Sequence, residues 1–548
     1  MRATLSDEAN DQYKAYLEPT RQPDWIKTMH SLGYEICARS YKHLGLRKDF
    51  RVISDIQVLK IIASDAASLV GLDRSAGEAV LNCRTMGLCQ PESKDICGAC
   101  ETYRKLLRYE NAFDYDDLIL FAVSVIKKNQ CDEVSLFVRK HSRHLLIDEY
   151  QDINSAQHEL IKLLCSDQED GLFAVGDDDQ SIYGWRGGSP KYILDFEEDF
   201  GPRAKVRILT NCRRCPPKIL SGALSLIIKN STYRRAKEGL QSSVKREGAI
   251  VIQNSPSAQK EAQFIASKAR GLVESHNVLI LVPRMDLASE VKKALRAVGV
   301  GYECRANIDE MGFSLIDLMS DWIDNQDDDL ALRRCIEKIV LNRDLSLPLE
   351  AGETRLGLLK EVSLLWENAM SEKSSLQEVL CRVPPNNTFL RSIAEQLGCV
   401  KPSSKPDEYL KNITRVLRPW ASTVSLKKEI SEWVDDGRAR STGGRNKVRI
   451  LTMQKAKGLS ADYVFIVGLE QGIFPRFSEE SEQKREERRL MYVSMTRARR
   501  ELFLCHSRKR PGNIGYGAKG LGVHQGVLAC STFLDEIDPV WLEECGWR

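Results

Sequence analysis

The stretch "LLIDEYQDINSAQHELIKLLCSDQEDGLFAVGDD", residues 145–178, decides the fold because it contains a strand, a helix and a second strand in succession. "HLLIDEY" and "GLFAVGD" are continuous apolar runs, and "SAQHELIKLLC" between them has apolar residues at helical spacing. Continuous apolar strands that alternate with helices are typical of a parallel sheet covered on both faces. The stretch therefore predicts an α/β fold.

The same alternation extends in both directions from this stretch. Before it, helices are expected within 25–45, through "DIQVLKIIASDAASLV" and through "NAFDYDDLILFAVSVIKK", which opens on acids. After it, "SPKYILDFEEDF" is expected to be a helix and "KVRILT" (205–210) a third strand. A second α/β block is interrupted by a mostly helical stretch, 305–435, and a polar linker at 435–447 leads back into the block. The expected strands of this block are "GAIVIQ", "NVLILVP", "KVRILTM", "YVFIVGL" and "ELFLCHS". Its expected helix is "SAQKEAQFIASKARGLV", which follows the first of these strands.

The composition is that of an ordinary globular protein with several cores. The chain has 548 residues, 42% hydrophobic and 29% charged, with a net charge of +3. Its longest apolar runs are far shorter than the roughly 20 residues that span a bilayer, and its N-terminus is polar. Sixteen cysteines are scattered through apolar segments, which favours a reducing compartment. We expect a soluble, cytoplasmic protein with no membrane partner.

Two acids stand where the first strand ends. Asp148 could hold Mg²⁺, and Glu149 could polarise a water molecule for attack on a phosphate. The alternative is an acidic loop that caps the next helix through Asp152 or Asn154.

The second strand runs into "FAVGDDDQSIYGWRGG", residues 173–188. Tyr183 and Trp185 flank a glycine, which favours exposed ring faces on which nucleic-acid bases stack. The alternative places both rings in a core and pairs Arg186 with an acid.

Arginines mark two further segments, "LTNCRRCPP" (209–217) and "EERRLMYVSMTRARREL" (486–502). An arginine that reaches a γ-phosphate stabilises the charge of the transition state. For any single arginine the alternative is a surface salt bridge.

Together, "DEYQD", "VGDDDQSIYGWRG", "TMQKAKGLSADYVFIVGLEQGIFP" and "EERRLMYVSMTRA", in this order, resemble the UvrD/Rep/PcrA family of superfamily 1 DNA helicases. The resemblance runs from "ATLSDEAND" near the start to "STFLDEI" at 531–537. It implies two RecA-like P-loop-NTPase-type motor domains with helical insertions. ATP and Mg²⁺ would bind between the motor domains, and hydrolysis would move the protein 3′ to 5′ along single-stranded DNA. Single strands and junctions with duplex DNA would be the partners, in repair or replication.

The resemblance also divides the chain into four parts. Domain 1A would comprise 1–24 and 109–205, and helical subdomain 1B residues 25–108. Domain 2A would comprise 206–303 and 440–548, and helical subdomain 2B residues 304–439.

Residue roles follow by position in the matching motifs. Asp148 would be the Mg²⁺ ligand, Glu149 the general base and Gln180 the sensor of the γ-phosphate. Arg213 and Arg497 would be arginine fingers, and Gly458 would lie at the nucleotide. The residues implied at DNA are Thr28, His30, Tyr183, Trp185, Arg186, Thr452 and Lys455.

The sequence departs from the family pattern at several motifs. No G-x-x-x-x-G-K-[ST] phosphate loop occurs in it, and "ATLSDEA" at 3–9 matches a segment that follows that loop in the family. Cys212, Ser460 and Gln454 stand where the family has tyrosine, glutamate and histidine. We expect either a truncated product of a longer helicase or a gene that starts upstream. The alternative function is a non-catalytic DNA-binding relic. A nuclease-fused helicase is disfavoured because no nuclease-like acid cluster is present.

Two groups of cysteines have spacings close to those of metal or redox sites. Cys83, Cys89, Cys97 and Cys100 fall within 18 residues, but their first spacing is longer than zinc knuckles use. Cys212 and Cys215 form a C-x-x-C. Isolated thiols are the default expectation, with structural zinc as the alternative for the first group.

Overall fold

The computed structural model describes residues 27–85, 94–129, 131–142, 144–165, 171–232, 234–304, 328–341, 354–383, 448–511, 523–524 and 527–545, with a few single residues between 318 and 393. The segment expected at 1–24, the linker expected at 435–447 and Cys89 lie outside the described residues.

The chain forms two compact units. Unit 1 comprises Met1–Arg143, Ser155–Glu169 and Asn307–Gly443, and unit 2 comprises His144–Asn154, Asp170–Ala306 and Gly444–Arg548. The four-part division by resemblance stays a prediction. In the structure, the described parts of 25–108 and 307–439 lie in unit 1, whereas Cys304 lies in unit 2.

A seven-stranded parallel sheet forms the centre of unit 2. Its order is β15-β7-β12-β11-β8-β10-β9, and every adjacent pair is parallel. The strands are β7 (Ala249–Ser255), β8 (Val278–Val282), β9 (Tyr302–Cys304), β10 (Val448–Thr452), β11 (Ala461–Val467), β12 (Ala498–Ser507) and β15 (Leu542–Cys545). Five of these strands were expected from their apolar runs, which confirms the predicted α/β class.

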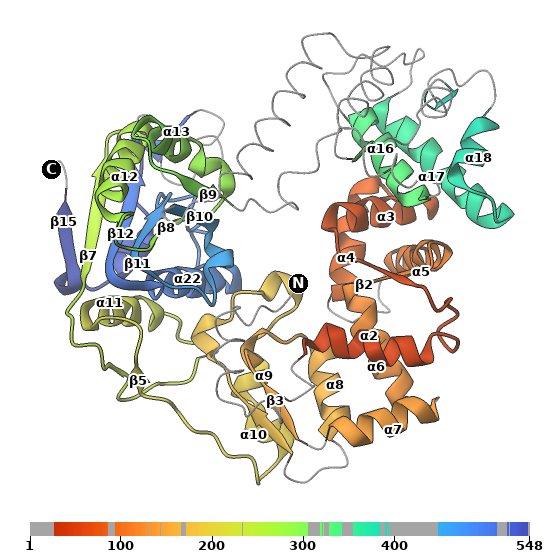
Figure 1. Cartoon of the computed structure of the whole chain (residues 1–548), viewed down its shortest axis with the longest axis horizontal. Helices are drawn as coiled ribbons and strands as arrows, with labels where there is room; N and C mark the ends of the chain where they lie inside the picture. Colours follow the sequence, from red (N-terminus) through yellow and green to blue (C-terminus); the bar gives the residue numbers. More distant parts are fainter. Residues whose placement is uncertain are drawn as a thin grey trace. The chain divides into compact units, whose positions relative to one another are not determined.

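Helices cover both faces of this sheet (Figure 1). Helices α11 (Pro217–Ile227) and α22 (Glu482–Met495) share one core with Leu279 and Leu281 of β8. Helices α12 (Ala258–Leu272) and α13 (Ser289–Ala297) share the opposite core with Ile280 of β8. Side chains alternate between faces along a strand, so a strand covered on both sides is apolar at every position. All five residues of β8 are buried.

The strands that gave the first sequence signal form a smaller element of unit 2. β3 (Leu145–Ile147) pairs in parallel with β4 (Leu172–Ala174) as a two-stranded sheet. The helix expected at 189–200 is two short helices, α9 (Lys191–Leu194) and α10 (Phe196–Phe200). The third strand expected at 205–210 is wrong, because these residues are not strand and Leu209 is 83% exposed. Ile208 is exposed as well, so two of the three apolar residues in this stretch lack cover in the described structure.

Shorter elements complete unit 2. β5 (Asn211–Cys212) pairs in parallel with β6 (Gln241–Ser242), and β13 (Val523–His524) pairs antiparallel with β14 (Val527–Leu528). Helix α24 (Thr532–Glu536) packs against α11 in the same core as α22.

Unit 1 is helical among its described residues, apart from the parallel pair β1 (Arg51–Ile53) and β2 (Ala112–Asp114). Asp114 caps α6 (Tyr115–Lys127) through a capping box with Asp117, at the helix start where the sequence has several acids. Its helices are α2 (Met29–Ser40), α3 (Ile56–Leu69), α4 (Gly77–Thr85), α5 (Lys94–Tyr109), α6 (Tyr115–Lys127), α7 (Asp132–His141), α8 (Ser155–Cys165), α16 (Asp329–Leu341), α17 (Arg355–Glu372) and α18 (Leu376–Cys381).

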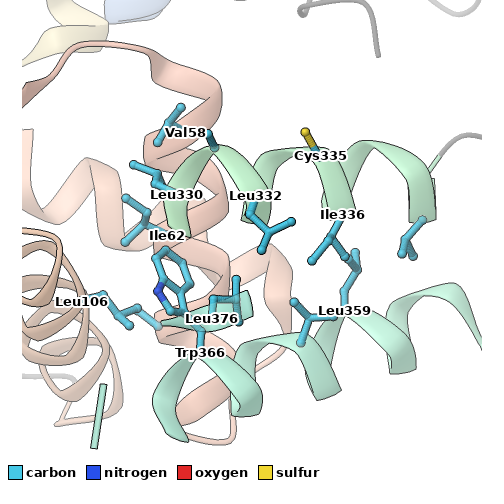
Figure 2. Close-up of a cluster of buried hydrophobic side chains, with 14 of the residues drawn as sticks. Val58, Ile62, Leu106, Leu330, Leu332, Cys335, Ile336, Leu359, Trp366 and Leu376 are labelled. Carbon is cyan, nitrogen blue, oxygen red and sulfur yellow. The ribbon is translucent and has the colours of Figure 1, made fainter. Parts of the chain in front are cut away.

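One core joins the early and late helices of unit 1. Figure 2 shows Ile62 and Leu106 beside Trp366, with Leu332 and Ile336 of α16 facing Leu359 of α17. A fully buried ion pair crosses the same junction, since Arg333 donates to both oxygens of Asp65 at 2.9 and 2.8 Å. Segments far apart in sequence therefore form one hydrophobic core.

No helix in the described parts of the chain combines the length and the apolar character that crossing a bilayer requires.

Candidate active site

Asp148 and Glu149 lie in a tight turn at the carboxyl end of β3. Glu149 has φ +55°, a left-handed conformation that few residues other than glycine adopt. The turn is held by the Glu149 amide, which donates to Asp148 Oδ1 at 2.9 Å, and by the Tyr150 amide, which donates to Val175 O at 2.9 Å. Partial burial, and then the charge of Glu149, raise the pKa of Asp148. Both carboxylates are exposed.

Gln151 connects this turn to the end of β4. Its buried side-chain amide donates to Glu149 Oε2, and its carbonyl accepts the Asp177 N–H at 2.9 Å. Gly176 must be small here, because an added Cβ would lie 2.4 Å from Gln151 Oε1. The amide therefore fixes the Glu149 carboxylate relative to the next loop.

Lys457 of the loop after β10 reaches the same carboxylate. Its ammonium lies 3.1 Å from Glu149 Oε2, pairs with Asp152 and donates to Gln180 O at 2.8 Å. Burial raises the pKa of Asp152 to about 6, although Lys457 acts in the opposite direction. The side chain of Asp152 pairs with the lysine, in place of the helix-capping role that was its alternative.

Gln180 and Arg497 meet beside these acids. Gln180 Nε2 donates to Asp177 Oδ2 at 2.7 Å, and Arg497 Nη2 lies 3.5 Å from Gln180 Oε1. Arg497 is buried and donates to Val493 O and Leu459 O at 2.7 and 3.3 Å. Burial and then the charge of Arg214 lower its pKa to about 10, while the charge of Glu149 acts in the opposite direction. The structure thus brings together Glu149, Gln180 and Arg497.

The second predicted arginine, Arg213, is exposed in the bend after β5. Within the described residues, no hydrogen bond or ion pair joins it to Glu149, Gln180 or Arg497. Its neighbour Arg214 is the residue whose charge acts on Arg497. The role of Arg213 therefore stays a prediction.

The three acids before Gln180 form a structural cluster. Lys237 pairs with Asp177, Asp178 and Asp179, and Arg234 donates to Asp179 Oδ1 at 2.8 Å. Burial raises the pKa of Asp177, but Lys237 and hydrogen bonds bring it below its ordinary value. These contacts fix the loop that carries Gln180.

The aromatic segment after Gln180 divides into a buried and an exposed part. Tyr183 is partly buried against the core of α11 and α22, and Lys457 lies 5.4 Å from its ring centroid. Trp185 is 58% exposed, and the Arg186 guanidinium lies 4.4 Å from its ring centroid. Trp185 and Arg186 therefore present a flat ring and a positive charge to solvent. The Gly184 amide, which donates to Glu486 Oε1 at 3.0 Å, anchors the segment to α22.

The other predicted DNA-contact residues, and Gly458, which was predicted at the nucleotide, lie on separate elements. Thr452 is buried at the end of β10, Lys455 follows it in the same loop as Lys457, and Gly458 has φ +80°. Thr28 and His30 belong to unit 1. Thr28 caps α2 by accepting the Ser31 N–H at 3.1 Å, and the His30 ring packs edge-on against Tyr115.

Comparison with known proteins places these motifs in a family. The profile described as UvrD/REP helicase N-terminal domain matches residues 3–201, and that described as UvrD-like helicase C-terminal domain matches 388–509. A DNA helicase II of Rickettsia typhi is 31% identical over 75% of this chain and 67% of the relative. The chain belongs to the UvrD/Rep helicase family.

Two further relatives cover more of the chain. The ATP-dependent DNA helicase Rep of Buchnera aphidicola is 28% identical over 89% of this chain and 84% of the relative. The ATP-dependent DNA helicase PcrA of Bacillus subtilis is 25% identical over 92% of this chain and 75% of the relative. Membership in the UvrD/Rep family confirms the resemblance drawn from the motifs.

The donor set at the end of β3 fits a magnesium ion. Mg²⁺ is bound in proteins by one or two carboxylates together with water and phosphate oxygens. Asp148 is an exposed carboxylate with a raised pKa, next to a second carboxylate, so a cation would relieve the local negative charge. No group of three or more His, Cys, Asp or Glu side chains suited to a metal occurs within the described ranges. Cys89 and the side chain of Cys97, which belong to the first cysteine group, lie outside the described ranges.

Sequence reasoning assigned no role to four residues of this site, namely Lys457, Gln151, Arg214 and Lys237. Lys457 and Gln151 stand inside quoted motifs, so their polar character next to the acids was an available signal. Arg214 stood next to the predicted Arg213. Lys237 has no local signal, because its three partners lie about 60 residues away in sequence.

Proposed function

We propose that this chain is an ATP-dependent DNA helicase that translocates 3′ to 5′ along single-stranded DNA and acts in DNA repair or replication. The observation that carries the proposal is the convergence of Glu149, Gln180 and Arg497 within one unit. The family relatives named as ATP-dependent DNA helicases support the same activity.

Glu149 is the general base for hydrolysis. A water molecule attacks the γ-phosphorus, its proton passes to the Glu149 carboxylate, and ADP leaves with the bridging oxygen. Gln151 orients the carboxylate through its hydrogen bond to Oε2. The ion pair with Lys457 must loosen during the cycle, because a paired carboxylate is a poorer proton acceptor.

Arg497 stabilises the charge that develops on the transferred phosphoryl group. Its guanidinium is held by the backbone carbonyls of Val493 and Leu459, so it needs little reorganisation. Asp148 would hold a Mg²⁺ ion, which neutralises phosphate charge when bound. Gln180 touches Arg497 and Asp177, and it begins the segment that leads to Trp185. This continuity connects the phosphate groups to the DNA-contact segment.

Trp185 and Arg186 contact single-stranded DNA. An exposed indole offers a stacking face to any base, and the adjacent guanidinium attracts the phosphate backbone. Tyr183, Thr452, Lys455, Thr28 and His30 complete the proposed contacts, and junctions with duplex DNA are the substrates for unwinding.

The test is hydrolysis and directional movement by the full chain. ATP hydrolysis should rise when single-stranded DNA is added. Streptavidin should be displaced from the 5′ end of a biotinylated strand, towards which the protein moves, and should stay bound at the 3′ end. Displacement from the 3′ end alone would contradict the direction, and hydrolysis that ignores DNA would contradict the coupling.

A second candidate is a DNA-binding protein without turnover. It is favoured by one observation, namely that residues 1–548 contain no G-x-x-x-x-G-K-[ST] string to hold the β- and γ-phosphates. Tight binding of single strands with no hydrolysis under any condition would select this candidate.

A further inference from the structure

Cys212 and Cys215 lie at the junction of β5 and α11, next to the proposed active site. Cys212 is half-buried, and Cys215 is buried two residues before Pro217, where α11 begins. The Cys215 N–H lies 3.5 Å from Cys212 Sγ. Both segments are held in place, because the Ser243 amide donates to Cys212 O at 2.9 Å and the Ser242 hydroxyl donates to Cys215 O at 2.6 Å.

The buried thiol of this pair contacts the segment that carries Arg497. Cys215 Sγ donates to the carbonyl oxygen of Thr496 at 3.3 Å. The Thr496 hydroxyl in turn accepts from Arg497 Nη2 at 3.1 Å. The thiol is therefore one residue away from the arginine that meets Gln180.

The two sulfurs have opposite acidities. The neighbouring Cys215 side chain, followed by the amides of Cys215 and Arg214 and the charge of Arg214, lowers the pKa of Cys212 to about 5. The neighbouring Cys212 side chain, together with burial, raises the pKa of Cys215. These shifts favour a thiolate at Cys212 and a protonated thiol at Cys215. A half-exposed thiolate beside a second thiol is the arrangement of redox-active C-x-x-C pairs.

We propose that Cys212 and Cys215 form a redox-active dithiol, which a low-molecular-weight disulfide converts into an intramolecular disulfide. The Cys212 thiolate attacks one sulfur of the small disulfide, forms a mixed disulfide and releases the other half as a thiolate. Cys215 Sγ then attacks Cys212 Sγ, and the second half leaves with the proton of Cys215. Two protein thiols are oxidised and one small disulfide is reduced to two thiols.

Oxidation removes the donor that Cys215 offers to Thr496. The carbonyl beside Arg497 loses a partner, and closing a disulfide between residues 212 and 215 rearranges the bend that carries Arg214. This consequence for hydrolysis rests on the proposed function, whereas formation of the disulfide does not. Arginines of this kind contribute orders of magnitude to the rate, so hydrolysis should fall by about tenfold or more on oxidation.

The test is thiol mapping of the full protein after incubation with oxidised glutathione. After alkylation, mass spectrometry should find Cys212 and Cys215 unalkylated, with a combined mass two hydrogens below that of the reduced residues. Cys165 is the matched control, because it is also half-buried but burial raises its pKa to about 11. Two alkylated thiols at 212 and 215, or oxidation of Cys165 to the same extent, would overturn the proposal.

Variants assign the roles of the two sulfurs. Cys215→Ser should stop the reaction at a glutathione adduct on residue 212, and Cys212→Ser should leave residue 215 unmodified. An adduct on Cys215 in the Cys212→Ser protein would contradict the assignment. Serine at 215 can still donate to Thr496 O, so before any oxidant is added this variant should hydrolyse ATP at the reduced protein's rate. If the disulfide forms and hydrolysis stays constant, the connection to Arg497 is wrong. If the reduced protein does not hydrolyse ATP at all, the proposed function fails. Thiol mapping still shows in that case whether Cys212 and Cys215 form a disulfide.

Discussion

Two groups of parallel strands in unit 2 differ in how well they are covered. β8, in the seven-stranded sheet, is buried along its whole length between the α11/α22 and α12/α13 layers. β3 and β4 form a pair in which Leu146 is 77% and Phe173 is 62% exposed. The acids and Gln180 follow the exposed pair, and Arg497 and Lys457 follow α22 and β10. The large sheet therefore supplies most of the stability, while the chemistry depends on loops that both groups of strands carry.

The largest effect on stability should follow from emptying the core of the large sheet. Phe465 is fully buried and stacks on Phe503 with ring centroids 4.5 Å apart. Phe465→Ala should lower the free energy of unfolding by about 3–5 kcal/mol, because it leaves a cavity. Phe173→Ala on the exposed pair is the control and should cost less than about 1 kcal/mol. If chemical denaturation gives the same loss of unfolding free energy for both variants, the two groups of strands do not differ in how much their cover stabilises the fold.

A slightly smaller loss should follow from removing the cation under the Gln180 loop. Lys237→Met leaves Asp177, Asp178 and Asp179 without their shared partner and should cost about 3 kcal/mol. Lys293→Met removes an exposed pair with Glu290 and should cost less than about 0.5 kcal/mol. Thermal unfolding that cannot distinguish the two variants would show that the acid cluster does not hold this loop.

The DNA contact should show an intermediate effect. Trp185→Ala should weaken binding of single-stranded DNA by about 1–3 kcal/mol, the range for one stacked base. Phe477→Ala removes another exposed ring of unit 2 and should leave affinity unchanged. Fluorescence anisotropy over a salt series measures both, and unchanged affinity for Trp185→Ala at every salt concentration would remove it from the contact surface.

The smallest effect concerns pH and Asp152. Because its pKa is raised to about 6 from 3.8, the folded state binds a proton more tightly than the unfolded state. This contribution to stability is complete below about pH 4 and is lost as the pH rises through 6. The difference in free energy of unfolding between the parent and Asp152→Asn, in favour of the parent, should therefore shrink from pH 4 to pH 7 in denaturant titrations. A constant difference would show that Asp152 titrates at its ordinary pH.

Much of the fold could be predicted from the sequence, because the strongest patterns are also the best covered. β7, β8, β10, β11 and β12 were expected from apolar runs, and α8 has the bounds of its amphipathic segment. The same criterion failed at 205–210, where Leu209 is apolar but uncovered. An apolar run reports what a strand could bury and cannot report whether a partner layer is present.

The candidate site was predictable where a residue follows a strand end or lies in a motif. Asp148, Glu149, Gln180 and Arg497 were named, and the structure brings Glu149, Gln180 and Arg497 together. Lys457 was not named, because a lysine in a loop is an ordinary surface residue until its partners across the fold are known. The contact of Cys215 with Thr496 joins residues about 280 apart and leaves no trace in local sequence.

The most direct test of the account is hydrolysis by Glu149→Gln, measured together with its unfolding. Glutamine keeps the shape of the side chain but cannot accept the proton of the attacking water. DNA-stimulated hydrolysis should fall by about a hundredfold or more, while binding of single-stranded DNA and the free energy of unfolding stay close to those of the parent. Undiminished hydrolysis in this variant would show that the carboxylate at the end of β3 is not the base, and would contradict the account.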